Sequence, residues 1–217
     1  MRDATLRYPN ILFDLDGTLT DPREGITRSV QFALARLGID EPDLARLEHF
    51  IGPPLLQCFM QTYGFDEARA WEAVNHYRER FRVTGLYENR VFDGIPELLE
   101  ALVGRGHTLY VATSKPGVFA REIAFDRHFK AIYGSELDGT RTHKDELIRH
   151  LLDSEGLAAE HCLMIGDRMH DLLGASRNGV ACIGVGYGFG SEDELRAHQP
   201  THYCADLAAL RQVLESH

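Results

Sequence analysis

Two aspartates one residue apart, Asp14 and Asp16, are the side chains in this sequence best placed to do chemistry. They follow the apolar run 11–13, which predicts a short buried strand, and alternation along that strand points both carboxylates to the same side. Adjacent carboxylates repel each other unless a cation lies between them or one holds a proton. The spacing therefore indicates a divalent metal site, acid–base chemistry, or both. A plain turn at Asp16-Gly17 is the alternative that this stretch leaves open by itself.

Polar side chains also follow two later apolar runs that predict strands. Thr113 and Ser114 come after the first of these runs, and Asp167 comes after the second, with Asp171 four residues further on. Parallel sheets bind ligands at the carboxyl ends of their strands. These groups are therefore expected to converge on the crevice that holds Asp14.

The three aspartates at the strand ends, Asp14, Asp16 and Asp167, are predicted to bind Mg²⁺, because this ion prefers hard oxygen ligands. Asp171 lies one turn into the following helix, where it can face the same site and support the metal directly or through water. Two alternatives stay open. Asp167 could instead cap that helix, and Asp171 could be a solvated helix residue.

A carboxylate can also attack phosphorus and form an aspartyl-phosphate. Asp14 is predicted to attack in line, and Asp16 to protonate the leaving oxygen and later to deprotonate water. Lys144, which opens a predicted helix, would supply positive charge to the phosphate. Thr113 and Ser114 would donate hydrogen bonds to the equatorial oxygens.

The charge balance limits the possible partners. Over 217 residues, 23 basic and 33 acidic side chains give a net charge of -10. A broad surface for a nucleic acid polymer or an anionic membrane would need basic patches, so neither partner is expected. A small phosphorylated substrate remains possible, because a local lysine and a metal can reverse the field inside a cleft. The chain is expected to be a monomer or a small homo-oligomer.

The sequence also indicates a cytoplasmic protein. It has no run near the roughly 20 apolar residues that span a bilayer, and its first residues lack an apolar signal core. The four cysteines form no CxxC pair, so zinc and redox chemistry are not expected. Buried, reduced thiols are the simpler interpretation.

Hydrophobic periodicity divides the chain into two parts. The spacing of apolar residues predicts helices throughout residues 21–85 and no strand, so this stretch is expected to form a helical insert. Residues 86–217 alternate strands with helices of 10 to 15 residues and, together with residues 1–20, predict an α/β core with a doubly wound parallel sheet. The insert is predicted to hold Trp71 in its own apolar core.

The segments that carry the chemistry resemble, in order and spacing, the four motifs of the haloacid dehalogenase superfamily. These segments are Asp14-x-Asp16-Gly17-Thr18-Leu19-Thr20, the strand end at Thr113, Lys144, and Gly166-Asp167-x-x-x-Asp171. The resemblance covers nearly the whole chain. It implies a Rossmann-like core, with residues 21–85 as the inserted helical cap domain.

Two short sequence segments indicate which group within the superfamily the chain resembles. Ile51-Gly52-Pro53-Pro54-Leu55 and Thr113-Ser114-Lys115-Pro116 look like the phosphoglycolate-phosphatase-like group, and most like its 5'-nucleotidase branch. This implies a phosphate monoester hydrolase that converts nucleoside 5'-monophosphates to nucleoside and phosphate. A phosphoglycolate phosphatase, or another phosphatase of small metabolites, is the alternative.

Other activities fit the residues less well. Dehalogenases of this superfamily lack the second aspartate, so Asp16 argues against that reaction, and a mutase would have to retain its product under the cap. A receiver-like phospho-acceptor switch is the non-enzymatic alternative. Such domains lack a large helical insert after the first strand and would give Asp16 no leaving group to protonate.

Several residues have competing interpretations. Asp145 follows Lys144, where many relatives carry a proline. Lys115 is a second candidate for the catalytic lysine, although a solvated loop cation is the interpretation we favour for it. The glycine-rich stretch 184–190 is expected to be a flexible loop at the rim of the crevice. Candidates for substrate contact at its mouth are Arg23, Glu24 and the turn 52–54.

Overall fold

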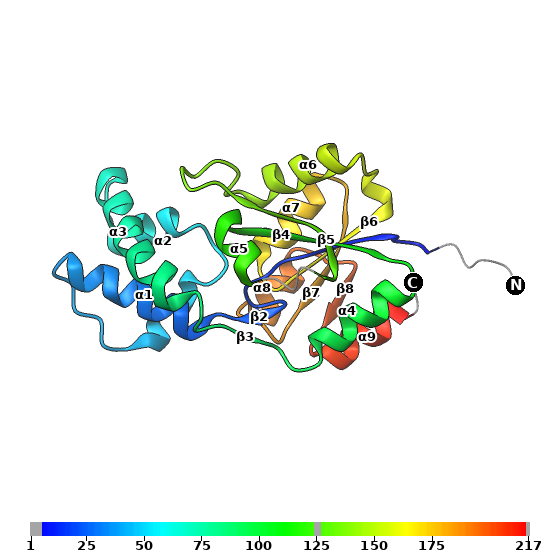
Figure 1. Ribbon diagram of the computed structural model, residues 1–217, viewed down its shortest axis with the longest axis horizontal. Coiled ribbons are helices and arrows are strands. Elements are labelled where there is room, and N and C mark those ends of the chain that lie inside the picture. The colour runs from blue at the N-terminus through cyan, green and yellow to red at the C-terminus, as the bar shows by residue number, and fades with distance from the viewer. Residues whose placement is uncertain (1–5, 124–126, 216–217) are drawn as a thin grey trace, which may run out of the picture.

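The computed structural model describes residues 6–123 and 127–215, and its centre is a six-stranded parallel sheet (Figure 1). The strands lie in the order β5-β4-β1-β6-β7-β8. Their bounds are β1 Asn10–Phe13, β4 Thr108–Pro116, β5 Phe129–Ser135, β6 Cys162–Gly166, β7 Ala181–Val185 and β8 His202–Cys204. All five strand pairs are parallel, so the prediction of a doubly wound α/β sheet is confirmed.

Helices cover both faces of this sheet because successive side chains of a strand point to opposite sides. Ile11 and Phe13 pack with helices α4 (Ile95–Gly104) and α9 (Leu207–Glu215). Leu12 packs on the other face with α6 (Lys144–Glu155), α7 (Met169–Arg177) and α8 (Glu192–Ala197). Within the described residues, no helix is both long and apolar enough to cross a bilayer.

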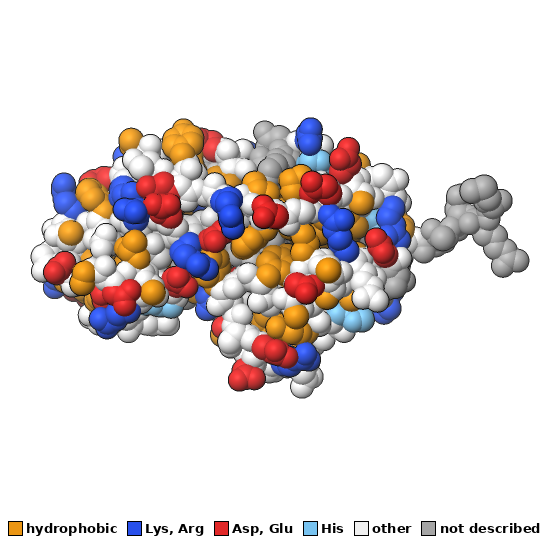
Figure 2. Space-filling view, turned by 90° about the horizontal axis from the view of Figure 1, so that it is seen from below, with side chains coloured by type: hydrophobic (Ala, Val, Ile, Leu, Met, Phe, Trp, Pro, Cys, Tyr) orange, Lys and Arg blue, Asp and Glu red, His pale blue; other side chains and the backbone are white. Residues whose placement is uncertain are grey.

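Residues 21–85 contain helices α1 (Arg23–Arg36), α2 (Leu55–Tyr63) and α3 (Glu67–Arg80), which lie together at the left of Figure 1. A 3-10 segment, Leu44–Phe50, and a π-helical segment, Phe81–Gly85, complete this helical unit. It has a hydrophobic core separate from the two that flank the sheet. Figure 2 shows two lobes with an indentation between them, and on that face basic and acidic side chains are interspersed.

A two-stranded antiparallel ribbon joins the helical unit to the sheet, and the sequence did not predict it. Strand β2 (Thr20–Asp21) pairs with β3 (Arg90–Val91), whereas the sequence pattern predicts a helical insert from residue 21 and a turn at residues 91–94. Strand β8 and helix α8 were also missed. Strands of two or three residues are too short to show a hydrophobic period. Apolar periodicity after the strand end at Thr113 also predicts a helix that reaches about residue 125. Helix α5 (Gly117–Ile123) corresponds to it, and residues 124 and 125 lie outside the described ranges.

Close backbone packing holds α1 against the π-helical segment. The amide of Gly25 donates to the carbonyl of Glu88, with an N–O distance of 3.2 Å. A Cβ atom at Gly25 would lie only 2.1 Å from the carbonyl oxygen of Gly85. Glycine is therefore required here because two backbones approach closely, and the contact sits directly beside the β2–β3 ribbon.

We expect Gly25→Ala to lower the free energy of unfolding by about 1–3 kcal/mol, because the added methyl overpacks this contact. Urea denaturation of the purified protein measures the change. Gly104→Ala is the matched control, since a Cβ at Gly104 has nothing within 4 Å. Equal stability of the two variants would contradict the packing argument.

Candidate active site

Every buried Asp, Glu, Lys or Arg side chain in the described part of the chain lies in one cluster at the carboxyl end of the sheet. The cluster consists of Asp14, Asp16, Lys115, Lys144, Asp167 and Asp171. Four carboxylates meet two ammonium groups, which leaves a formal charge of -2 when all six are ionised. Burying unbalanced charge is costly, so protons or a cation must make up the difference.

Lys144 lies at the centre of one half of this cluster. Its Nζ donates to Asp14 Oδ1 and to the carbonyl of Ala112, both at 2.7 Å, and it pairs with Asp171 Oδ1 at 2.6 Å. Burial lowers the pKa of Lys144, but the two carboxylates outweigh burial and leave its pKa above the ordinary value. The first residue of α6 is thus a permanent cation fixed against Asp14.

Lys115 forms the other half with Asp16, and its interpretation as a solvated loop cation was wrong. Lys115 is buried near the end of β4, and its Nζ donates to Asp16 Oδ1 at 2.8 Å. The same ammonium lies 4.9 Å from the centroid of the Phe81 ring, which belongs to the helical unit. Burial raises the pKa of Asp16, and Lys115 offsets only part of that rise.

Asp14, Asp167 and Asp171 form an acidic group that could hold a metal ion. Each offers a carboxylate oxygen, and these oxygens lie within 4.8 Å of one another. Burial raises the pKa of Asp167 well above its ordinary value, and the neighbouring Asp14 and Asp171 raise it further. This excess of hard oxygen donors fits a divalent cation. Asp16, which the sequence predicts as a metal ligand together with Asp14 and Asp167, has its carboxylate paired with Lys115.

Asp167 is held from two sides and does not cap helix α7. Its Oδ1 accepts from Thr18 Oγ1 at 3.2 Å and its Oδ2 from the amide of Phe189 at 2.8 Å, whereas Arg168 occupies the cap position. Phe189 belongs to the glycine-rich loop after β7. A Cβ at Gly188 would come within 2.4 Å of Asp167, so this loop packs directly against the carboxylate.

Thr113 and Ser114 have different surroundings. Thr113 is buried, and its Oγ1 accepts from the amide of Lys115 at 3.2 Å. Ser114 is partly exposed, and its carbonyl accepts from Ser135 Oγ at 2.9 Å. Ser114 also lines the cavity that opens onto the charged cluster.

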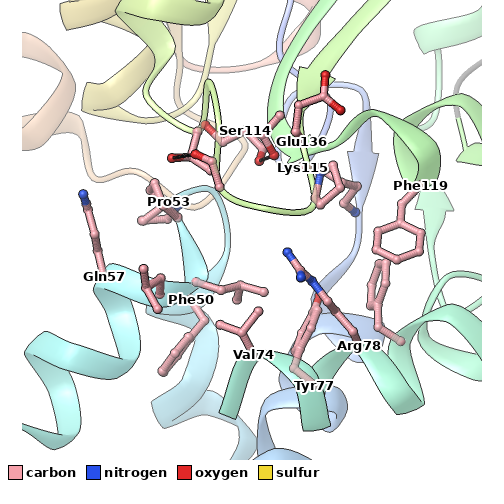
Figure 3. Close-up of a pocket in the computed structure, with 18 of the residues that line it drawn as sticks. Phe50, Pro53, Gln57, Val74, Tyr77, Arg78, Ser114, Lys115, Phe119 and Glu136 are labelled. Carbon is pink, nitrogen blue, oxygen red and sulfur yellow. Dashed lines mark hydrogen bonds between the residues drawn. The ribbon is translucent and has the colours of Figure 1, made fainter. Parts of the chain in front are cut away.

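This cavity, of about 350 Å³, lies between the helical unit and the core (Figure 3). Asp16, Ser114 and Lys115 contribute to its wall from the core. Much of the remaining wall is aromatic and comes mainly from the helical unit. The aromatic residues are Phe50, Trp71, Tyr77, Phe81 and Phe119.

Sequence reasoning missed this aromatic wall because helical spacing of apolar side chains looks the same whether they face a core or a cavity. Trp71, expected in the interior of the insert, lines the cavity. Its ring faces Gly139 of the core, where an added Cβ atom would lie 3.5 Å from the ring. The turn 52–54 also lines it, as expected. Arg23 and Glu24 do not, and instead border a separate surface groove.

Comparison with known proteins identifies the family. A family model described as haloacid dehalogenase-like hydrolase matches residues 11–185. The chain belongs to the haloacid dehalogenase-like hydrolase family. The expected resemblance is therefore confirmed, and the chain is a hydrolase.

Three relatives show how closely this hydrolase matches known proteins. A 5'-nucleotidase from Pseudomonas aeruginosa is 97% identical and covers 100% of both chains. The tyrosine-protein kinase PtkA of Mycobacterium tuberculosis is 36% identical over 94% of this chain and 72% of its own length. The crystal structure of a predicted phosphatase from Clostridium acetobutylicum superimposes with a TM-score of 0.95, at 42% identity, and covers 97% of this chain and 99% of its own.

The raised pKa of Asp167 predicts how the stability of the metal-free hydrolase depends on pH. The unfolded chain releases this proton near the ordinary value of 3.8, whereas the folded protein binds it to higher pH. Stability contributed by the protonated form is therefore present below the unfolded pKa and is lost as pH rises toward the folded pKa. Each unit of difference corresponds to about 1.4 kcal/mol.

We expect the unfolding free energy in EDTA to fall as the pH rises above about 4, and to fall less in Asp167→Asn, which cannot ionise. Urea denaturation at each pH measures both slopes. Equal slopes for the wild type and the variant would show that Asp167 does not cause the pH dependence of the unfolding free energy.

Proposed function

We propose that this hydrolase is a Mg²⁺-dependent phosphatase that converts nucleoside 5'-monophosphates to nucleoside and inorganic phosphate through an aspartyl-phosphate at Asp14. The observation that carries the proposal is that Asp16 and Lys115, which belong to the buried charged cluster, line one side of an aromatic cavity. The 97% identity to the P. aeruginosa 5'-nucleotidase supports the choice of substrate. In this proposal residues 21–85 are the cap and residues 1–20 and 86–217 are the catalytic core.

The two lysines support different roles for the two aspartates. Asp14, held by Lys144, attacks phosphorus with one carboxylate oxygen while the bond from phosphorus to the leaving oxygen breaks. Asp16 gives its proton to that leaving oxygen, and the raised pKa of Asp16 favours this acidic form. Water then attacks the phosphorus of the aspartyl-phosphate and passes a proton to Asp16, while the bond from phosphorus to the Asp14 oxygen breaks. This releases inorganic phosphate, frees the Asp14 carboxylate and returns the proton to Asp16.

The remaining polar groups bind and orient the phosphate. Lys144 supplies positive charge, and Ser114 and Thr113 are proposed to donate to the phosphoryl oxygens once substrate is present. Asp14, Asp167 and Asp171 are the candidate ligands for Mg²⁺, because their oxygens already lie together. When bound there, Mg²⁺ would reduce the repulsion between these carboxylates and a phosphate dianion.

The cavity favours a nucleoside over a small acid as the rest of the substrate. A planar base can stack on the partly exposed aromatic side chains of the cavity, Trp71 and Phe119, which supply apolar contact area. Phosphoglycolate would leave this wall unused. The charged lining does not by itself discriminate, because the cations Arg78 and Lys115 line the cavity together with Glu67, Glu136 and Asp138.

We expect kcat/KM for UMP to exceed that for phosphoglycolate by about 100-fold or more, because the base gains contact with the aromatic wall that phosphoglycolate cannot make. Steady-state release of inorganic phosphate with saturating Mg²⁺ measures both values. Comparable values would replace the nucleotidase proposal with that of a phosphatase for small metabolites.

Substitution of the two aspartates tests the reaction itself. Asp14→Asn is expected to lower kcat for UMP by about 10³-fold or more, and Asp16→Asn to do the same while Mg²⁺ binding is partly retained. The matched control is Asp145→Asn, which removes a surface carboxylate paired with Arg177. Full turnover in Asp14→Asn would refute its role as the nucleophile.

A further inference from the structure

Arg168 connects the core to the wall of the cavity, although no step of the reaction uses it. It follows Asp167 directly and precedes helix α7. Its Nη1 donates to the main-chain carbonyl of Ile51 at 2.7 Å. Ile51 leads into the turn Gly52-Pro53-Pro54, which lines the cavity from the cap side (Figure 3). A side chain of the core thus holds a loop of the cap.

Glu194 on helix α8 fixes the orientation of this arginine. Its Oε1 accepts from Arg168 Nε at 3.0 Å and from the amide of Met169 at 2.9 Å. The side chains of Arg168 and Glu194 are only 14% and 21% exposed, so water screens the pair weakly. A planar guanidinium can present Nε to one partner and Nη1 to another at the same time, which a lysine cannot do.

Gly52 gives independent evidence that the loop is fitted to this arginine. Its φ is +100°, and a Cβ placed there would lie 2.9 Å from Arg168 Cγ. The backbone of the loop therefore lies directly on the aliphatic part of the arginine side chain. A larger residue at Gly52 would be strained and would push the loop away from Arg168.

We propose that Arg168, held by Glu194, is a positioning residue that keeps the turn 52–54 against the nucleoside half of the cavity. This inference rests on the proposed function, since it assigns a nucleoside to that half. Arg168 then determines the affinity for the nucleoside part of the substrate. It leaves unchanged the phosphate half, by which we mean the side of the cavity lined by Asp16, Ser114 and Lys115.

The test compares KM for UMP with the inhibition constant of inorganic phosphate, which occupies the phosphate half alone. In Arg168→Lys and Glu194→Gln we expect KM for UMP to rise about tenfold, as for loss of a charge-assisted hydrogen bond, with kcat and the phosphate Ki within about twofold of wild type. Gly52→Ala approaches the same contact from the cap and is expected to raise KM similarly. Arg177→Lys, on the exposed end of α7, is the control.

The outcomes separate this inference from the proposed function. If the wild type does not hydrolyse UMP, the proposed function fails and the positioning role fails with it. If the wild type hydrolyses UMP, an unchanged KM in all three variants overturns the positioning role alone. A parallel rise of KM and of the phosphate Ki also overturns it, because Arg168 would then act on the phosphate half.

Discussion

The burial of four carboxylates with only two ammonium groups is the constraint on which the rest of this structure depends. Such a cluster is unstable in a protein interior unless each charge has a partner. The parallel sheet makes the cluster possible by bringing three strand ends, and the first turns of α6 and α7, to one edge. Every other feature of the site either supplies a partner to these charges or covers them.

The two lysines divide the cluster into halves with different chemistry. Lys144 is buried between Asp14 and Asp171, and keeps its charge there. Lys115 is paired with Asp16, which burial still pushes toward its protonated form. Two aspartates one residue apart in the sequence thus lie in environments that suit attack by one and proton transfer by the other. Separation of the environments of paired carboxyl groups is a general way to assign such roles.

The helical unit contacts the site from the opposite side. Phe81 lies over the ammonium of Lys115, and the carbonyl of Ile51 accepts from Arg168. Both core residues lie next to the charged cluster. Lys115 is paired with Asp16, and Arg168 follows Asp167 in the sequence. The position of the helical unit is therefore linked to the charged cluster through two defined contacts.

The sequence was sufficient for the fold class and for Asp14, Asp16 and Asp167 of the charged cluster, because polar residues at the end of a strand are a local pattern. Lys115 and Asp171 were harder, since whether a charged side chain is buried depends on elements that pack against it from elsewhere in the chain. The β2–β3 ribbon was missed because two residues show no period. The contact of Arg168 with Ile51 joins residues 117 positions apart, and no local pattern reports it.

The most direct test of the charge constraint is the number of protons released when Mg²⁺ binds. Isothermal titration calorimetry at pH 6, 7 and 8, in buffers of different ionisation enthalpy, measures this number. If protons on the buried carboxylates make up the missing charge in the metal-free protein, Mg²⁺ must displace them, and the release must decrease as pH rises. Tight Mg²⁺ binding without proton release at any of these pH values would contradict the account.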